Sequence, residues 1–169
     1  MLKELVEGHE VEHFDLYAMD IRGCSGCLRC KKQDGCSIKD DMTTIYRAIE
    51  KADAVVIGSP IYMCEETACT KAFAERTYAL LNNEGDRRPK YVPKLKGGKI
   101  GVAIFPCGNP LGRRSFRTVR KNYEKHFRTL GFDDWQVHIV PGIHPGVDAL
   151  QDKGARRILG KTKAFLGPA

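Results

Sequence analysis

Four cysteines stand close together in the first quarter of the chain, in the spacing C-x2-C-x2-C-x5-C: Cys24, Cys27, Cys30 and Cys36. Three thiolates at two-residue intervals let one short loop wrap a cubic cluster, and C-x2-C-x2-C is a typical bacterial spacing for [4Fe–4S] ligation. A ferredoxin run has three residues before its last cysteine and a proline after it, whereas here there are five and Ser37 follows. The pattern therefore predicts a cluster site, but not a ferredoxin repeat.

Zinc and redox-active thiols are the alternatives for this cysteine run. Zinc also accepts four thiolates, but structural zinc sites usually pair two separated C-x2-C knuckles. Disulfides are disfavoured because nothing else in the chain indicates secretion. The spacing favours a cluster and leaves zinc or free thiols open. The remaining candidate ligands show no metal-ligand spacing with the cysteines: His9, His13, His126 and His138.

Length and composition indicate one globular domain over residues 1–169. Apolar residues make up 42% of the chain and charged residues 29%, which suits a protein with a full-sized core. No apolar run approaches the length of a membrane span, and the first residues do not form a signal peptide. Seven cysteines without an export signal predict a reducing compartment. We therefore expect a cytoplasmic protein that does not contact a membrane.

The net charge of +7 is unevenly distributed. Residues 1–85 carry 10 Lys/Arg against 15 Asp/Glu, whereas residues 86–169 carry 18 against 6. On a predicted helix, part of this excess falls at steps of three or four and forms one stripe: Arg113, Arg117, Lys121, Lys125 and Arg128. The stripe is either a solvated helix face or a docking surface for an acidic electron-transfer partner or a phosphorylated cofactor. Nucleic acid is disfavoured, because the aromatic residues here lie on the opposite, core-facing side.

Apolar patterning predicts strands alternating with helices. Strands are expected near residues 11–17, 54–58, 100–105 and 135–140. The chain is expected to begin in a helix that ends near Gly8, and the polar stretch 83–98 reads as a connection. The other helices are expected at 42–52 with Asp40 and Asp41 as caps, at the positions of Phe73, Thr77 and Leu81, along the basic stripe, and at apolar positions from Val147 to Leu166. This alternation predicts an open α/β fold with a largely parallel sheet.

Two loops in this arrangement are candidates for binding a planar cofactor. Ligands of open α/β sheets bind at the carboxyl ends of the strands, near the point where strand order reverses. Residues 58–63 and 106–110 form proline- and glycine-containing loops that leave the carboxyl ends of two predicted strands. No serine–histidine–acid set and no pair of carboxylates indicates acid–base catalysis. The chemistry is therefore expected to belong to bound cofactors, with no catalytic side chain.

Together these residues resemble the iron–sulfur flavoproteins, a branch of the flavodoxin-like FMN reductase family. The matching stretch runs from about Asp20 to Arg76 and includes the cysteine run and the segments 38–42, 52–62 and 71–76. The later elements follow the family order to the C-terminus. The resemblance implies a flavodoxin-like, mostly parallel open sheet with helices on both faces. It also implies a cluster-binding loop at residues 20–41.

The resemblance implies two cofactors and an FMN-dependent electron-transfer activity. The four cysteines would hold one [4Fe–4S] cluster, and FMN would lie at the strand-end loops. The donor is typically ferredoxin, an acidic carrier, and the assembly a dimer or tetramer; the acceptor is unknown. The alternative is a flavin-free cluster- or zinc-binding interaction module on a remnant flavodoxin scaffold. The residues that would border the isoalloxazine are Ser59, Pro60, Ile61, Tyr62, Met63, Gly108 and Asn109.

One part of the family pattern is missing from this sequence. Relatives open with a strand and a Gly-Ser-Pro-Arg-like loop, whose backbone amides cradle the FMN phosphate. This sequence starts inside the helix that should follow that loop. Either its true start lies upstream or the phosphate site has been lost. A sheet that omits its central strand would leave backbone groups unpaired, so an upstream start is expected, with the first strand missing from this chain.

Overall fold

The computed structural model describes residues 2–85 and 87–168, and its centre is a three-stranded parallel sheet in the order β1-β6-β7. The strands are β1 (Ala54–Gly58), β6 (Ile100–Cys107) and β7 (Asp134–Pro141). Val56 lies opposite Val102 in the register of β1 with β6. The middle strand β6 is buried along most of its length, as its continuous apolar run predicts. Among the described residues, no strand pairs with the outer edge of β1.

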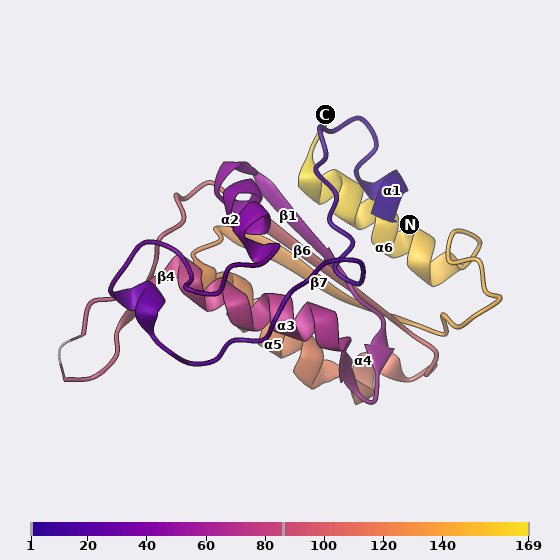
Figure 1. The fold of residues 1–169 in the computed structure, drawn as a ribbon. Coiled ribbons are helices and arrows are strands. Elements are labelled where there is room, and N and C mark those ends of the chain that lie inside the picture. The colour runs from indigo at the N-terminus through magenta and orange to yellow at the C-terminus, as the bar shows by residue number, and fades with distance from the viewer. Residues whose placement is uncertain (1, 86, 169) are drawn as a thin grey trace.

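Helices cover both faces of the sheet (Figure 1). Side chains of β6 alternate between the two faces, so that Ala103 and Phe105 join one core and Val102 and Ile104 join the other. This arrangement confirms the predicted α/β fold with an open parallel sheet. The helices on the first face are α2 (Met42–Lys51), α3 (Ala68–Arg76) and α5 (Arg117–Leu130), and those on the second are α1 (Leu2–Leu5) and α6 (Lys153–Leu166).

The strand expected near residues 11–17 is wrong. This segment has no strand pairing; it runs as irregular chain and turns where the Asp15 carboxylate accepts a hydrogen bond from the Tyr17 amide at 3.1 Å. Phe14 and Leu16 still pack against the core under α2, α3 and α5. The apolar residues Phe14 and Leu16 are therefore explained by their partial burial against the core, which does not require pairing with a neighbouring strand.

The stretch 83–98 is more ordered than a plain connection. It contributes to an antiparallel hairpin of β4 (Leu81–Asn83) and β5 (Tyr91–Pro93). The preceding helix also ends earlier than expected, at Arg76, and continues as the 3-10 turn η2 (Thr77–Leu80). Leu81 therefore begins a strand instead of closing a helix.

The last two helices differ from their predicted bounds at their N-termini. The basic segment breaks at Phe116 into α4 (Gly112–Ser115) and α5, so Arg113 does not share a helix with the rest of the stripe. Helix α6 starts only at Lys153, where the Asp152 side chain accepts a hydrogen bond from the Ala155 amide at 2.8 Å. Val147 and Leu150 lie before this cap. No helix within the described ranges combines the length and apolar character needed to cross a bilayer.

Helix α5 packs close to the sheet and turns its basic side outward. Its buried residues include Tyr123 and Phe127, while Lys121 and Lys125 are exposed. Gly101 on β6 makes the close approach possible, because a Cβ at this position would lie 2.5 Å from the Phe127 ring. The basic and apolar sides of α5 therefore lie as the sequence predicts.

Candidate functional site

The two ends of the cysteine loop (residues 20–41) are hydrogen-bonded to each other, and we call this junction the neck of the loop. The Asp20 amide donates to the Asp41 carboxylate at 2.8 Å, and the Asp41 amide donates back to the Asp20 carbonyl at 3.2 Å. The Arg22 amide donates to the Asp40 carboxylate at 3.1 Å. Asp40 also accepts from the Met42 amide at the start of α2, whereas Asp41 makes no side-chain cap. Of the two predicted caps, Asp40 therefore contacts a helix amide through its side chain, whereas Asp41 accepts from helix amides through its backbone carbonyl.

Arg76, the last residue of α3, holds this neck from the protein side. Its guanidinium donates to both carboxylate oxygens of Asp40, with Nη2 to Oδ1 at 2.9 Å, and neither side chain is exposed. It also donates to the carbonyls of Arg22 at 2.9 Å and Ile38 at 3.3 Å. Burial opposes ionisation of Asp40, but the hydrogen bonds from Arg76 and the Arg22 amide outweigh it and lower the pKa of the carboxyl. We call this set of contacts the Arg76 clasp.

A second anchor lies inside the loop, at the short helix η1 (Arg29–Lys31). The Lys31 ammonium donates to the carbonyls of Tyr78 and Leu81, the latter at 2.6 Å, and lies 3.7 Å from the centre of the Tyr78 ring. Lys94, just after β5, donates to the Cys30 carbonyl at 3.4 Å. These contacts hold η1 against η2 and β4. Cys30, in the middle of η1, is buried there.

The structure places the four predicted ligands on one anchored loop, but it does not gather their sulfur atoms. Cys24 and Cys27 are exposed, Cys36 is partly buried and Cys30 is buried. Over residues 2–85 and 87–168, no three Cys, His, Asp or Glu side chains lie together as a metal-binding group. Four thiols fit iron–sulfur or zinc chemistry by donor type. The conformation described here does not form the complete coordination sphere.

Hydrogen bonds to the Cys27 thiol favour its ionised form. A hydrogen bond with Ser37, whose Oγ lies 3.3 Å from its Sγ, and a backbone hydrogen bond at Arg29 lower its pKa to about 7. Burial instead raises the pKa of the Cys107 thiol.

In metal-free, reduced protein we expect iodoacetamide to alkylate Cys27 before Cys107, with a rate that rises as the pH passes through about 7. The thiolate is the reactive form, so the rate should level off above this pH. Peptide mass spectrometry over a pH series measures it. Ser37→Ala should move the midpoint of the Cys27 profile upward. An unchanged midpoint in that variant would contradict the assigned cause.

The first candidate flavin loop follows β1 and is fixed by Ser59. This buried side chain accepts from the Thr67 amide at 3.1 Å and lies 3.2 Å from the Thr67 hydroxyl. Beyond Pro60, the chain forms β2 (Ile61–Tyr62) and turns back through Met63 and Cys64, both with positive φ, into β3 (Glu65–Glu66). Ile61 is buried, whereas 66% of Tyr62 and 96% of Met63 is exposed.

The second candidate loop follows β6, the strand next to β1. Gly108 and Asn109 are exposed there, and the Asn109 side chain accepts from the Leu111 amide at 2.8 Å and donates to Ser115 at 3.2 Å. Because β1 and β6 are parallel neighbours, both loops lie at the same edge of the sheet. The two predicted segments thus come together, although the side chains of Ser59 and Ile61 are buried in the protein.

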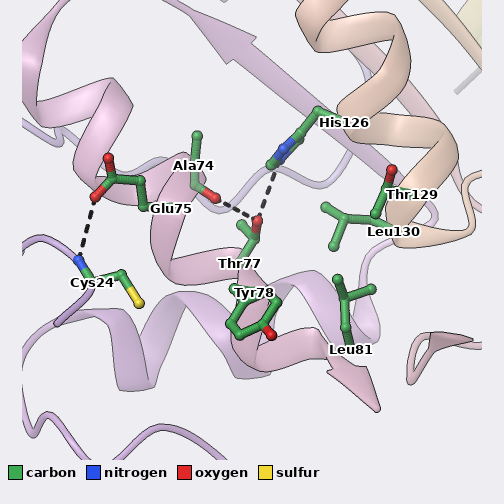
Figure 2. A pocket seen from close by; sticks show the side chains of 9 residues that line it. All are labelled: Cys24, Ala74, Glu75, Thr77, Tyr78, Leu81, His126, Thr129 and Leu130. Carbon is green, nitrogen blue, oxygen red and sulfur yellow. Dashed lines mark hydrogen bonds between the residues drawn. The ribbon is translucent and has the colours of Figure 1, made fainter. Parts of the chain in front are cut away.

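A hollow of about 380 Å³ lies between the cysteine loop, η2 and α5 (Figure 2). On one side the Cys24 amide donates to the Glu75 carboxylate at 3.4 Å. On the other, His126 Nε2 lies 3.4 Å from the Thr77 hydroxyl, and burial, with a smaller effect of Lys71, lowers the pKa of the imidazole to about 4. His126 is therefore neutral at neutral pH. Sequence spacing gave no signal for this grouping, because its members come from distant segments.

Comparisons with known proteins show the family and the fold of the chain. The family model described as NADPH-dependent FMN reductase matches residues 1–109. The chain belongs to the NADPH-dependent FMN reductase family. The chain is 36% identical over 121 residues to an iron–sulfur flavoprotein of Methanocaldococcus jannaschii, in a match that covers 70% of this chain and 56% of the relative. It is 40% identical over 108 residues to an iron–sulfur flavoprotein of Archaeoglobus fulgidus, which covers 63% and 45%.

The chain spans about half the length of these curated relatives. Two solved structures of oxidoreductases share the fold of this chain. An NAD(P)H:quinone oxidoreductase from Methanothermobacter marburgensis superposes with a TM-score of 0.71 at 18% identity, covering 99% of this chain and 87% of that one. An FMN-dependent NADH-azoreductase from Bacillus anthracis, solved with FMN, gives 0.63 at 17% identity and covers 97% and 84%. The predicted family and the flavodoxin-like fold are thus confirmed.

Proposed function

We propose that this chain is an FMN-dependent oxidoreductase of the iron–sulfur flavoprotein type, which carries electrons through a [4Fe–4S] cluster and FMN. The observation that carries the proposal is the path of α3. Its last residue, Arg76, clasps the neck of the cysteine loop, and its first turn follows Thr67, which holds Ser59 in the candidate flavin loop. One helix therefore links the two cofactor loops.

The residues that would hold each cofactor are those of the two anchored regions. Cys24, Cys27, Cys30 and Cys36 would supply four thiolates to the cluster. At the carboxyl end of the sheet, Tyr62 and Met63 would border one side of the flavin ring, and Gly108 and Asn109 the other. Ser59, Pro60 and Ile61 would support the first loop from the protein interior. Bound FMN supplies one- and two-electron chemistry that no side chain here offers. The protein's own part is to bind, orient and shield it.

We further propose a homodimer or homotetramer that receives electrons from an acidic carrier such as ferredoxin. Support for self-assembly comes from large apolar side chains that are exposed in and after the candidate flavin loops. Tyr62 and Met63 are exposed after β1, and Leu111, after β6, is 69% exposed. Support for an acidic donor comes from the excess of Lys and Arg in residues 86–169.

The test is the cofactor content of the protein purified under anaerobic conditions. We expect about four iron and four sulfide per chain, the composition of one [4Fe–4S] cluster, and one flavin released by acid. The absorption band of the cluster should bleach with dithionite. Iron-free, colourless protein would overturn the proposal, and zinc without flavin would establish the interaction module instead.

A further inference from the structure

A second hollow, of about 450 Å³, opens beside η1 and the β4–β5 hairpin. Its lining is polar and mostly cationic or neutral, with one carboxylate: Cys30, Lys31, Lys32, Gln33, Asp34, Asn82 and Lys94. We call it the lysine hollow. No ion pair within the described part of the chain involves any of its three lysines. Among the described residues, three lysines thus share this lining with a single carboxylate, Asp34, and form no ion pair with it.

The surroundings of the lysine hollow add to its positive charge. Residues 87–96, which include β5, contain five Lys or Arg and no Asp or Glu. Arg87, Arg88, Lys90 and Lys96 are exposed, and among the described residues Lys90 pairs with Glu84 at 3.8 Å while the other three form no ion pair. Figure 1 shows the β4 hairpin and the tip of the cysteine loop side by side at one end of the molecule, as the contact between β4 and η1 requires.

Two of the cations are held in place before any partner arrives. The hydrogen bonds of Lys31 to the carbonyls of Tyr78 and Leu81, and of Lys94 to the Cys30 carbonyl, fix these side chains. A partner that binds fixed charges loses less side-chain entropy than one that must order flexible lysines. Lys32 is exposed at the rim and is free to meet a partner.

We propose that the lysine hollow and the hairpin residues 87–96 form the docking surface for the acidic face of a protein electron carrier. The inference rests on the proposed function and assigns a binding surface to its electron donor. Complementary charge steers such a carrier to this surface, and Cys30 in the wall of the hollow brings the cluster loop within reach. Electron transfer weakens steeply with distance, so docking at the cluster loop favours it. The α5 stripe is then a solvated helix face.

The test compares two pairs of charge reversals with the same change in net charge. Lys32→Glu with Arg88→Glu alters the proposed surface, and Arg156→Glu with Arg157→Glu alters exposed residues of α6, on the opposite face of the sheet. A small ferredoxin of net negative charge serves as the probe, with its Kd measured by calorimetry at low and high salt. We expect the first pair to raise the Kd by about 10-fold or more at low salt, and the second by less than about 2-fold.

Four outcomes would overturn the docking surface: equal weakening in both pairs, no weakening in either, binding that ignores salt, or a hollow that takes inorganic phosphate but no ferredoxin. Reduction by dithionite, which needs no docking, should proceed equally in all variants. The binding measurement does not require loaded cofactors. Salt-dependent ferredoxin binding by a chain without cluster or flavin would thus support the surface while contradicting the proposed function.

Discussion

Replacing Arg76 by leucine is expected to lower the free energy of unfolding by about 3–5 kcal/mol, because it leaves the Asp40 carboxylate buried without its partner. The same change removes the donors to the carbonyls of Arg22 and Ile38, so the neck of the cysteine loop loses its tie to α3. Urea unfolding followed by circular dichroism measures the loss. Arg76→Lys keeps the charge but not the two-pronged geometry, and should lie between the wild type and Arg76→Leu.

A double variant, Asp40→Asn with Arg76→Leu, separates the clasp from general core damage. With both charges gone, no ion remains buried alone, so the loss should be smaller than the sum of the two single losses. An additive result would contradict the clasp.

The acid side of the stability curve gives an independent check on the same pair. The folded pKa of Asp40 is lowered, so its stabilisation is present above the unfolded pKa of about 3.9 and is lost as the pH falls through the folded value. Arg76→Leu should flatten this acid limb. A wild-type profile that stays flat below pH 4 would count against an ionised Asp40.

The second large effect is expected from Cys24→Ser combined with Cys27→Ser. This change replaces two of the four proposed thiolate ligands by poor iron donors, so the iron content should fall by more than about 10-fold, beyond the usual cost of losing an outer partner of a metal site. Both side chains are exposed, so the fold should be little affected. Flavin content should stay near that of the wild type, because the candidate FMN loops follow β1 and β6 and contain neither cysteine.

Cys69→Ser is the matched control for this experiment. Cys69 lies on α3 with its Sγ 3.2 Å from the Thr67 hydroxyl, and a serine there can keep that contact. Iron should be retained in the control. If Cys24→Ser with Cys27→Ser retains full iron, the loop is not the cluster site.

The amino-acid sequence by itself determined the elements that depend on neighbours along the chain. Strands β1 and β6 follow from continuous apolar runs, and α5 follows from apolar residues at helical spacing. The cysteine spacing indicated a ligand set on one loop, and the order of strands placed both candidate flavin loops at one edge of the sheet. The expected strand near residues 11–17 failed because alternating burial does not by itself supply a pairing partner.

Only the tertiary structure decided how the cysteine loop is held. Arg76 lies 54 residues from Arg22, whose carbonyl it binds, and Lys31 lies 50 residues from Leu81. Such pairs leave no periodic signal, because their contact exists only once α3 and β4 have packed against the sheet. The sequence of this protein therefore identifies the candidate thiol ligands. Long-range hydrogen bonds and a buried ion pair, which form only in the folded chain, determine the position of their loop.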